Sequence, residues 1–402
     1  MSDTMKWASA LSKRPSLEAA VAEVVELAQS SLQAPADLGI VFISSAFTSE
    51  YSRLLPLLQE RLSVPALIGC SGGGIIGMQQ GQIQEMEGTP ALSLTLAHLP
   101  GVEVSAFHVV AEELPDLDSS PTAWVDLFGV APSPTPNFIL LSEVSSSQIN
   151  DLLPGLDFAY PGSVCVGGLA SSSQLGGRIS LFINDRIYKE GTVGVAMSGN
   201  IALDTIVAQG CRPIGKPYQV SSCDRNILLE LEAQPPLVVL RDLLESLSEY
   251  DRDLAQNSLF VGVARDEFKL NLEQGDFLIR NLLGVDPKFG AIAIGDRLRP
   301  GQRIQFHLRD AQTSADDLEY LMQRYQKQNQ SHQAAGALMF SCLGRGEELY
   351  GKPNFDSQMF HRYLNNVPLG GFFCGGEIGP VGGNTFLHGY TTVIGICRQQ
   401  RG

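Results

Sequence analysis

The segment IVFISS (residues 40–45) is followed by LLPLL (54–58) and then by CSGG (70–73), and this order of patterns decides the fold class. IVFISS is a short continuous apolar run, which is typical of a buried strand. LLPLL predicts a helical stretch, and Pro65 with a second apolar run precedes the cysteine and its glycines. A strand, a helix and a second strand that opens into a glycine turn make a β-α-β unit.

The same order occurs twice more along the chain. The further copies are FILLSE (138–143), LLPGL (152–156) and CVGG (165–168), and then ALMFSC (337–342), a helical stretch near 358–364 and CGG (374–376). Three matches in the same order predict structural repetition. We therefore expect an α/β fold: a two-part chain built from mixed β-sheets, with β-α-β units and Gly-rich turns after strands.

Other segments indicate the domain organisation. Helices are predicted over residues 16–32, 223–231, 237–247 and 315–328, and strands over 277–282, 291–294 and 303–307. Gly, Pro and Cys interrupt the patterns near 210–218, which predicts a boundary between two halves there. The predicted parts are an N-terminal helix in residues 1–35, an N-terminal domain over 36–212 and a C-terminal domain over 213–402.

The composition excludes several classes of protein. The 402 residues carry 28 Lys and Arg against 43 Asp and Glu, a net charge of −15. Because binding to nucleic acid or to an anionic membrane needs a dense basic face, neither partner is expected. The uncharged stretch 62–84 has the length of a membrane span, but Pro65 and its many glycines predict a turn between buried strands. No membrane insertion is expected.

Cysteine and histidine usage indicates a reducing compartment and no metal site. The seven cysteines form no C-x-x-C pair, and their odd number and wide spacing do not fit a disulfide framework. Residues 1–16 lack the apolar core of a secretory signal, so the predicted location is cytoplasmic. The six histidines show no metal-ligand spacing. No cofactor is predicted, although a single axial histidine leaves haem open.

Scarce charges beside glycine turns predict a ligand site in the C-terminal part. Glu377 is the only charged residue in 363–397, and Arg345 follows a predicted strand through Gly344. Two cations and one anion around a small space would match a zwitterion such as an amino acid. The predicted ligand-binding residues are Arg280, Cys342, Arg345, Cys374, Gly376 and Glu377.

Two alternatives compete with a ligand site. Arg345 and Glu377 could pair with each other on the surface, where an ion pair contributes little. The chain could also be an enzyme that uses Cys342 or Cys374 as its nucleophile, which needs a base within hydrogen-bond reach. Because no recognisable catalytic motif occurs in the sequence, no catalytic residue is assigned and non-catalytic binding is the preferred interpretation.

Five stretches resemble the FIST sensory domain family, which has an N-terminal and a C-terminal part in tandem. They are IGCSGGGIIG (68–77), DFLIRNLLGVDP (276–287), GQRIQFHLRDA (301–311), GALMFSCLGRG (336–346) and PLGGFFCGGEIGPVGGNTFLHGYT (368–391). The resemblance covers nearly the whole chain. It identifies 36–212 with the FIST N-terminal domain and 213–402 with the FIST C-terminal domain.

The resemblance implies a soluble intracellular module that senses a small ligand, with amino acids or similar metabolites proposed for the family. Members occur fused to kinase, receptor or F-box segments, and some resemble haem-bound nitric oxide sensors. This chain shows no such output segment, so we expect a separate signalling partner. A Cys-dependent enzyme and a haem-based gas sensor are the alternative functions.

Overall fold

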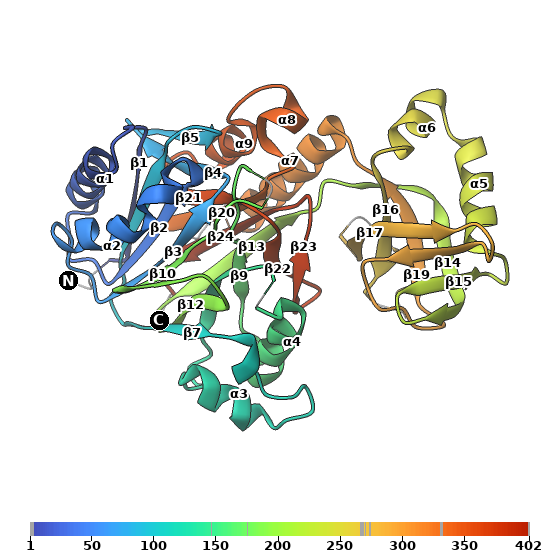
Figure 1. The fold of residues 1–402 in the computed structure, drawn as a ribbon, viewed down its shortest axis with the longest axis horizontal. Helices are drawn as coiled ribbons and strands as arrows, with labels where there is room; N and C mark the ends of the chain where they lie inside the picture. Colours follow the sequence, from blue (N-terminus) through green and yellow to red (C-terminus); the bar gives the residue numbers. More distant parts are fainter. Residues whose placement is uncertain are drawn as a thin grey trace. The chain divides into compact units, whose positions relative to one another are not determined.

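The computed structural model describes residues 4–145, 147–174, 176–265, 269, 271–272, 275–329 and 333–400. The chain divides into two compact units. Ala208–Leu318 form the first, which we call the barrel unit, and Met1–Val207 with Glu319–Gly402 form the second, which we call the three-sheet unit. Both units combine helices with multi-stranded sheets, which confirms the predicted α/β class (Figure 1).

Three six-stranded sheets build the three-sheet unit. The first sheet has the order β1 (Lys6–Ser12), β6 (Leu92–His98), β2 (Leu38–Ser44), β3 (Ala66–Gly72), β10 (Leu181–Ile183), β11 (Arg186–Tyr188). The second has the order β7 (Val102–Val109), β12 (Thr192–Gly199), β8 (Asn137–Ser142), β9 (Cys165–Leu169), β22 (Glu377–Val381), β23 (Asn384–His388). The third has the order β13 (Ala202–Ala208), β24 (Thr392–Arg398), β20 (Gly336–Cys342), β21 (Leu369–Cys374), β4 (Gly74–Gln79), β5 (Gln82–Glu87).

A parallel strand pair lies at the centre of each sheet, and each pair is one copy of the repeated pattern. The pairs are β2–β3, β8–β9 and β20–β21. The helices between the paired strands are α2 (Tyr51–Gln59), α4 (Ile149–Ala159), and α8 (Gly346–Tyr350) with α9 (Phe355–Tyr363). All three copies therefore follow a strand-helix-strand path, and the predicted repetition is confirmed.

The repetition extends beyond the β-α-β units. A returning strand pairs antiparallel with the first strand of each pair: β6 with β2, β12 with β8 and β24 with β20. A further helix precedes each pair, namely α1 (Leu17–Leu32), α3 (Pro121–Phe128) and α7 (Ala311–Gln328). Each repeat thus runs through an outer strand, a helix, a strand, one or two helices, a strand, a hairpin and a returning strand. The six barrel strands and helices α5 and α6 are inserted between the outer strand β13 and α7 of the third repeat, and the boundary between the two units falls within α7.

The hairpin of every repeat pairs with the sheet of another repeat. Hairpin β4–β5 follows β3 of the first sheet but pairs with β21 of the third sheet. Hairpin β10–β11 follows β9 and pairs with β3, while hairpin β22–β23 follows β21 and pairs with β9. The exchange is cyclic, so each sheet takes two of its six strands from a different repeat.

The three sheets enclose a common core and carry helices outside. Aromatic rings of the first and third sheets meet there: Phe42 stacks on Phe372 at 4.8 Å between centroids, and Phe340 meets Phe372 edge-on at 6.0 Å. Ile139 and Val166 of the second sheet complete the same cluster. Separate apolar clusters hold α1 and α2 on the first sheet and α3 and α4 on the second. Burial of large apolar side chains on both faces explains why these strands are continuous apolar runs.

One glycine marks the same position in each parallel pair. Gly69, Gly167 and Gly371 stand opposite Val41, Leu140 and Met339. A Cβ on any of these glycines would overlap the carbonyl oxygen of the residue opposite. The cysteines that suggested the repeat are not equivalent in this register, because Cys70 follows its glycine by one residue, Cys374 follows by three and Cys165 precedes by two. The alignment of the three copies on their cysteines was therefore wrong.

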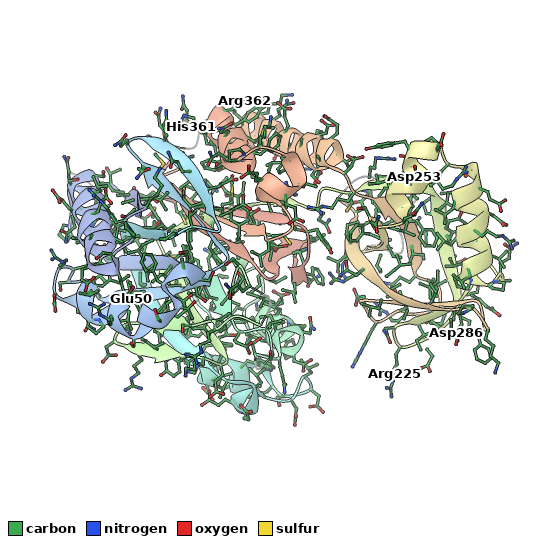
Figure 2. The ribbon with its side chains drawn as sticks, turned by 45° about the horizontal axis from the view of Figure 1, so that its top comes forward. Glu50, Arg225, Asp253, Asp286, His361 and Arg362 are labelled. Atoms are coloured by element: carbon green, nitrogen blue, oxygen red, sulfur yellow. The ribbon has the colours of Figure 1, made fainter. Side chains whose placement is uncertain are left out.

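The barrel unit is closed by six strands in the order β14 (Arg212–Asp224), β15 (Ile227–Leu231), β18 (Ala291–Ile294), β17 (Phe277–Asp286), β16 (Leu259–Ala264), β19 (Arg303–Leu308). Helices α5 (Pro236–Ser246) and α6 (Glu249–Ala255) follow β15. Figure 2 shows the side chains of Arg225, in the β14–β15 turn, and Asp286, at the end of β17, extending from the barrel.

Most segments expected from the periodicity have the expected structure. Helices α1, α5 and α7 and strands β17, β18 and β19 confirm their predictions. The helix predicted over 223–231 is wrong, because this stretch is the β14–β15 hairpin. Arg225 takes a φ of 54° in its turn, and in β15 Leu228 and Leu231 are buried while Leu229 and Glu230 between them are exposed, at a register shift of the hairpin.

Residues 1–35 hold strand β1 as well as α1. The sequence domains 36–212 and 213–402 meet at the start of β14, whereas the compact units separate at 207/208 and 318/319. Among the described residues, no helix combines the length and the apolar character that crossing a membrane requires.

Candidate functional site

The carboxyl ends of the three parallel pairs meet in the three-sheet unit. The N–H of Gly73, after β3, donates to Oγ of Ser171, after β9, at 2.9 Å. The Ser171 hydroxyl donates in turn to the carbonyl of Phe373 in β21. We call this region the strand-end junction, defined as Ser45, Gly73, Ser171–Ser173, Leu343 and Cys374–Gly376. Ligands of α/β sheets commonly bind at the carboxyl ends of strands.

Close backbone approach makes the junction. A Cβ on Gly73 would overlap Cδ2 of Leu343 and would crowd the backbone of Ser172 and Ser173. On the outer side, the hydroxyls of Ser45 and Ser173 lie 2.7 Å apart. Gly375 and Leu343 are exposed, so the junction reaches the surface.

Five of the six predicted ligand-binding residues lie at this junction or beside it. Leu343, which follows Cys342, donates its N–H to the carbonyl of Cys374 at 3.0 Å. The carbonyl of Gly376 accepts the N–H of Leu169 at 2.8 Å. The remaining two, Arg345 and Glu377, are joined through the segment before β24, as described next.

Arg345 is fully buried and forms a bidentate ion pair with Asp356. Its Nε and Nη2 lie 2.7 and 3.0 Å from Oδ2 and Oδ1 of Asp356, and it also donates to the Tyr350 hydroxyl. The Thr392 hydroxyl donates to the same carboxylate at 2.7 Å. Burial alone would raise the pKa of Asp356, but the charge and hydrogen bonds of Arg345 outweigh it and hold this pKa below its usual value.

Glu377 is also fully buried. Its Oε2 accepts the N–H of Thr391 at 3.0 Å, next to Tyr390, whose carbonyl accepts from Arg345 at 3.5 Å. The two charged side chains therefore hold adjacent residues of one segment. Because neither is exposed, a surface pair between Arg345 and Glu377 is excluded.

Arg280, the sixth predicted residue, lies in the barrel unit, on β17 opposite Val261. Its Nε donates to Oδ2 of Asp296 at 3.0 Å, and its side chain is only 14% exposed. Burial lowers the pKa of Arg280, and Asp296 opposes that shift. The structure thus divides the predicted set between the two units.

Burial disfavours the thiolate form of three cysteines in the three-sheet unit. Burial raises the pKa of Cys70, Cys165 and Cys374 well above that of a free thiol. All seven cysteines are free. Within the described part of the chain, no group of three or more His, Cys, Asp or Glu side chains could hold a metal ion.

Two carboxylates next to this site are not among the residues predicted from the sequence. Glu85, on β5, accepts the N–H of Ser357 at the start of α9 at 2.7 Å, and Glu87 accepts the N–H of Glu347 in α8 at 2.9 Å. The sequence signal is the alternation along β5, where Glu85 shares the buried face of Ile83. A glutamate in an apolar position could have drawn attention to this strand.

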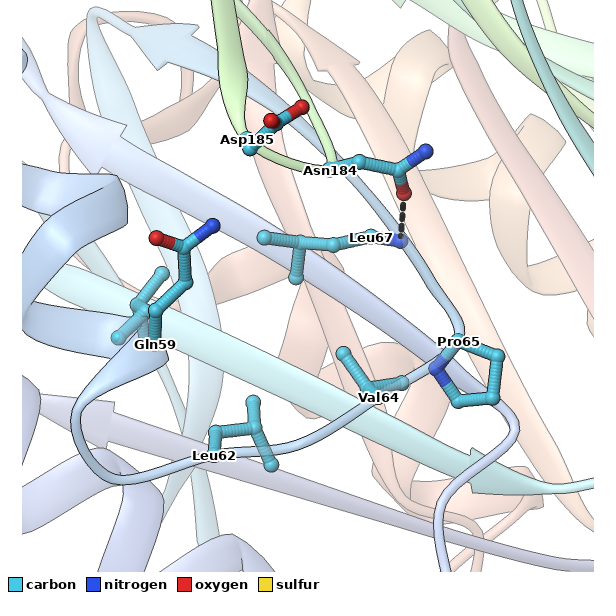
Figure 3. Close-up of a pocket in the computed structure, with 8 residues that line it drawn as sticks. Gln59, Leu62, Val64, Pro65, Leu67, Asn184 and Asp185 are labelled. Carbon is cyan, nitrogen blue, oxygen red and sulfur yellow. Dashed lines mark hydrogen bonds between the residues drawn. The ribbon is translucent and has the colours of Figure 1, made fainter.

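A surface pocket lies elsewhere in the three-sheet unit (Figure 3). Its apolar part comes from the end of α2 and the segment leading into β3, and its polar part from Asn184 and Asp185 in the β10–β11 turn. The Asn184 side chain accepts the N–H of Leu67 at 3.0 Å. A second pocket shares Asn184 and Asp185 and includes His108, which stacks on Tyr188. Neither pocket is lined by a predicted ligand-binding residue.

The sequence matches two known protein domains. Residues 37–234 match the FIST N domain, and residues 236–380 match the FIST C domain. An uncharacterized protein of Mycobacterium tuberculosis is 33% identical over 394 residues, covering 98% of this chain and 99% of the relative. An uncharacterized protein of Mycobacterium bovis is 32% identical over 383 residues, covering 95% of this chain and 96% of the relative.

Among solved structures, a cyanuric acid hydrolase from A. caulinodans aligns over 97% of this chain and 99% of its own. The TM-score is 0.32 and the sequence identity is 9%, which is too distant to support an argument about function.

Proposed function

Because the chain belongs to the FIST family, whose domains are sensory and ligand-binding, we propose that it binds a small molecule, an amino acid or a related metabolite, and signals through a separate protein partner. The proposed ligand site is the strand-end junction. The location of action would be the cytoplasm, where free thiols persist.

The observation that carries the proposal is the meeting of three strand ends beside two buried, oppositely charged side chains. Arg345 and Glu377 are both 0% exposed, and each holds a neighbouring residue of the segment before β24. Burying a charged side chain costs desolvation free energy, so the burial of these two is weak evidence for stability alone. We therefore infer that these charges position the turns that contact the ligand.

The ligand itself would touch the accessible part of the junction. Leu343 and Gly375 are exposed there, and the hydroxyls of Ser45 and Ser173 offer hydrogen bonds. Small ligands are typically held by apolar contact together with a few placed polar groups. Arg280 is a ligand contact only if the barrel unit takes part, so this proposal rests on the other five predicted residues.

Binding without catalysis is favoured over a Cys-dependent enzyme. Burial raises the pKa of the Cys374 thiol, which leaves little thiolate at neutral pH. A gas sensor that binds haem through one histidine is the remaining alternative. A Soret band in the purified protein would support haem, and turnover with alkylation of Cys342 would support an enzyme.

Native mass spectrometry of the purified protein, followed by calorimetric titration with single amino acids, tests the proposal. We expect a retained small molecule or saturable binding, which Leu343→Glu should weaken at least tenfold. Leu117→Glu is the matched control, because Leu117 is also an exposed leucine, at 55%, and lies outside the junction. Equal binding by both variants would place the ligand elsewhere.

Glu377→Gln tests the charge. The amide keeps the size and the acceptor for Thr391 but removes the negative charge buried next to the junction, so the electrostatic attraction of an amine-bearing ligand, and with it binding, should be lost while the fold persists. Unfolding of Glu377→Gln, as monitored by its Tm, would instead make Glu377 purely structural.

A further inference from the structure

The exchanged hairpin β4–β5 holds two helices of the third repeat. Glu85 and Glu87 accept N–H groups at the first turns of α9 and α8, as described above. In return, the backbone N–H of Glu85 donates to Oδ1 of Asn354, the residue before α9, at 2.6 Å. These bonds join residues about 260 to 270 positions apart, so the hairpin from the first repeat positions the helices of the third.

The charges buried between these elements do not balance if every carboxyl is ionised. Glu85, Asp356 and Arg345 are 5%, 2% and 0% exposed. Asp356 already neutralises Arg345 through two hydrogen bonds. An ionised Glu85 would add a second negative charge to a region with one guanidinium, and an uncompensated buried charge is costly.

The charged groups that shift the pKa of Glu85 and of its neighbour Glu87 are acidic, while the cations nearby are Arg345, which is paired with Asp356, and Lys13, which donates to Gln84. Glu87 lies on β5 itself, Asp356 comes from α9, and Glu347 and Glu348 of α8 act on Glu87. Strand β4 has no ionisable side chain. Burial raises the pKa of Glu85 to about 8, and the charge of Asp356 adds to the shift.

We propose that Glu85 is a proton-operated latch: its protonated carboxyl keeps the β4–β5 hairpin seated on α8 and α9, and loss of that proton to water releases the hairpin. The proton would reside on Oε2, since Oε1 accepts the N–H of Ser357, and Oε2 is a buried atom with no hydrogen-bond partner among the described residues. Ionised, the carboxylate gains hydration only by leaving its buried position.

The latch acts on the candidate ligand site through Arg345. Arg345 directly precedes α8 and binds Asp356 in the first turn of α9. Release of the hairpin would remove its hydrogen bonds to the first turns of α8 and α9. The turn that carries Arg345, directly before α8, would then be less firmly held. This consequence for ligand binding rests on the proposed function, whereas the latch itself does not.

Hydrogen exchange of the full chain between about pH 5 and pH 9 tests the latch at the amide of Ser357. After correction for the intrinsic rate, protection should fall about tenfold per pH unit up to about pH 8 and then level off, because opening releases one proton. In Glu85→Gln the protection should be independent of pH. The control Glu103→Gln, an exposed glutamate on β7, should keep the wild-type profile. Matching profiles for wild type and Glu85→Gln would overturn the latch.

Infrared difference spectroscopy of the wild type keeps the proposal testable if Glu85→Gln does not fold. A protonated carboxyl band should be present at about pH 6 and lost by about pH 9. Its absence at about pH 6 would overturn the latch.

Titration with single amino acids at both pH values separates the two proposals. Binding that weakens at high pH in the wild type but not in Glu85→Gln supports regulation of the site. A pH-dependent latch without any amino-acid binding refutes the proposed function and leaves the latch intact.

Discussion

The three-sheet unit and the barrel unit take their strands from the chain in different ways. All six barrel strands lie between Arg212 and Leu308 and pair with one another. In the three-sheet unit, each sheet includes a hairpin from another repeat, so hairpin β22–β23 completes a sheet that begins 275 residues earlier, at Val102.

This difference indicates which part of the chain can fold on its own. Unpaired sheet edges leave backbone N–H and C=O groups without partners, which destabilises a sheet and invites association. The residues that match the FIST N domain lack β22–β23, and those that match the FIST C domain lack β4–β5. The two domain matches therefore divide the interlocked three-sheet unit, and they also divide the barrel, whose β14 and β15 lie in the first match and whose other strands lie in the second.

The largest expected effect separates the two units. A chain of residues 208–318 should fold cooperatively, because its barrel closes on itself. A chain of residues 1–207 should not, because it lacks β22–β23 and the third side of the common core. Circular dichroism melts measure both. A cooperative transition in 1–207 would contradict the interlocking, and its absence in 208–318 would contradict the autonomy of the barrel.

The next effect compares a buried ion pair with an exposed one. Asp356→Ala leaves the guanidinium of Arg345 buried without its carboxylate, and we expect a loss of about 3–5 kcal/mol in the free energy of unfolding. Glu232→Gln in the barrel removes an ion pair with Lys216 whose side chains are 43% and 63% exposed, and should cost less than about 1 kcal/mol. Urea unfolding measures both changes. Similar losses would show that burial does not set the energetics of the Arg345 pair.

Low pH should reduce the stability of the barrel, whereas high pH should release the β4–β5 hairpin through Glu85. Burial lowers the pKa of His307 to about 4, although its bond to the Gln305 carbonyl opposes the shift. Between about pH 6.5 and pH 4 the unfolded chain binds a proton that the folded barrel does not, so stability falls as pH falls, by about 3 kcal/mol. Hydrogen exchange of β19 measures the slope, which His307→Gln should remove. An unchanged slope in that variant would assign the acid sensitivity to another group.

The smallest expected effect comes from replacing one glycine in each unit by alanine. In Gly371→Ala the new Cβ overlaps the carbonyl oxygen of Met339, so about 1–3 kcal/mol should be lost. Gly284 on β17 of the barrel has open space around its Cα, and Gly284→Ala should stay within about 0.5 kcal/mol of the wild type. Thermal melts of the two variants provide the measurement. Equal shifts in Tm would mean that strands β20 and β21 move apart at little cost to accommodate the added methyl group.

The sequence predicted the individual strands and helices of the β-α-β units well. Continuous apolar runs such as residues 40–45 and 138–143 became buried strands, and the intervening helices followed each time. It also grouped six residues into one ligand site, of which Cys342, Arg345, Cys374, Gly376 and Glu377 lie at or after the ends of two strands of one β-α-β unit, whereas Arg280 lies in the barrel unit. The cysteine alignment failed, since a cysteine in an apolar run packs as a small hydrophobic residue and its position is not constrained.

The β-α-β units are determined by the sequence alone, because hydrophobic periodicity and turn residues act over a few positions. Only the tertiary structure decided which sheet each hairpin joins. Every strand edge offers the same N–H and C=O groups, so pairing between β4 and β21 has no signature in either segment. The placement of Glu85 against α9, and of Arg280 in a different unit from Arg345, depends on that pairing and on the insertion of the barrel. Side chains hundreds of residues apart share a buried site through packing, which the spacing of residues along the chain does not record.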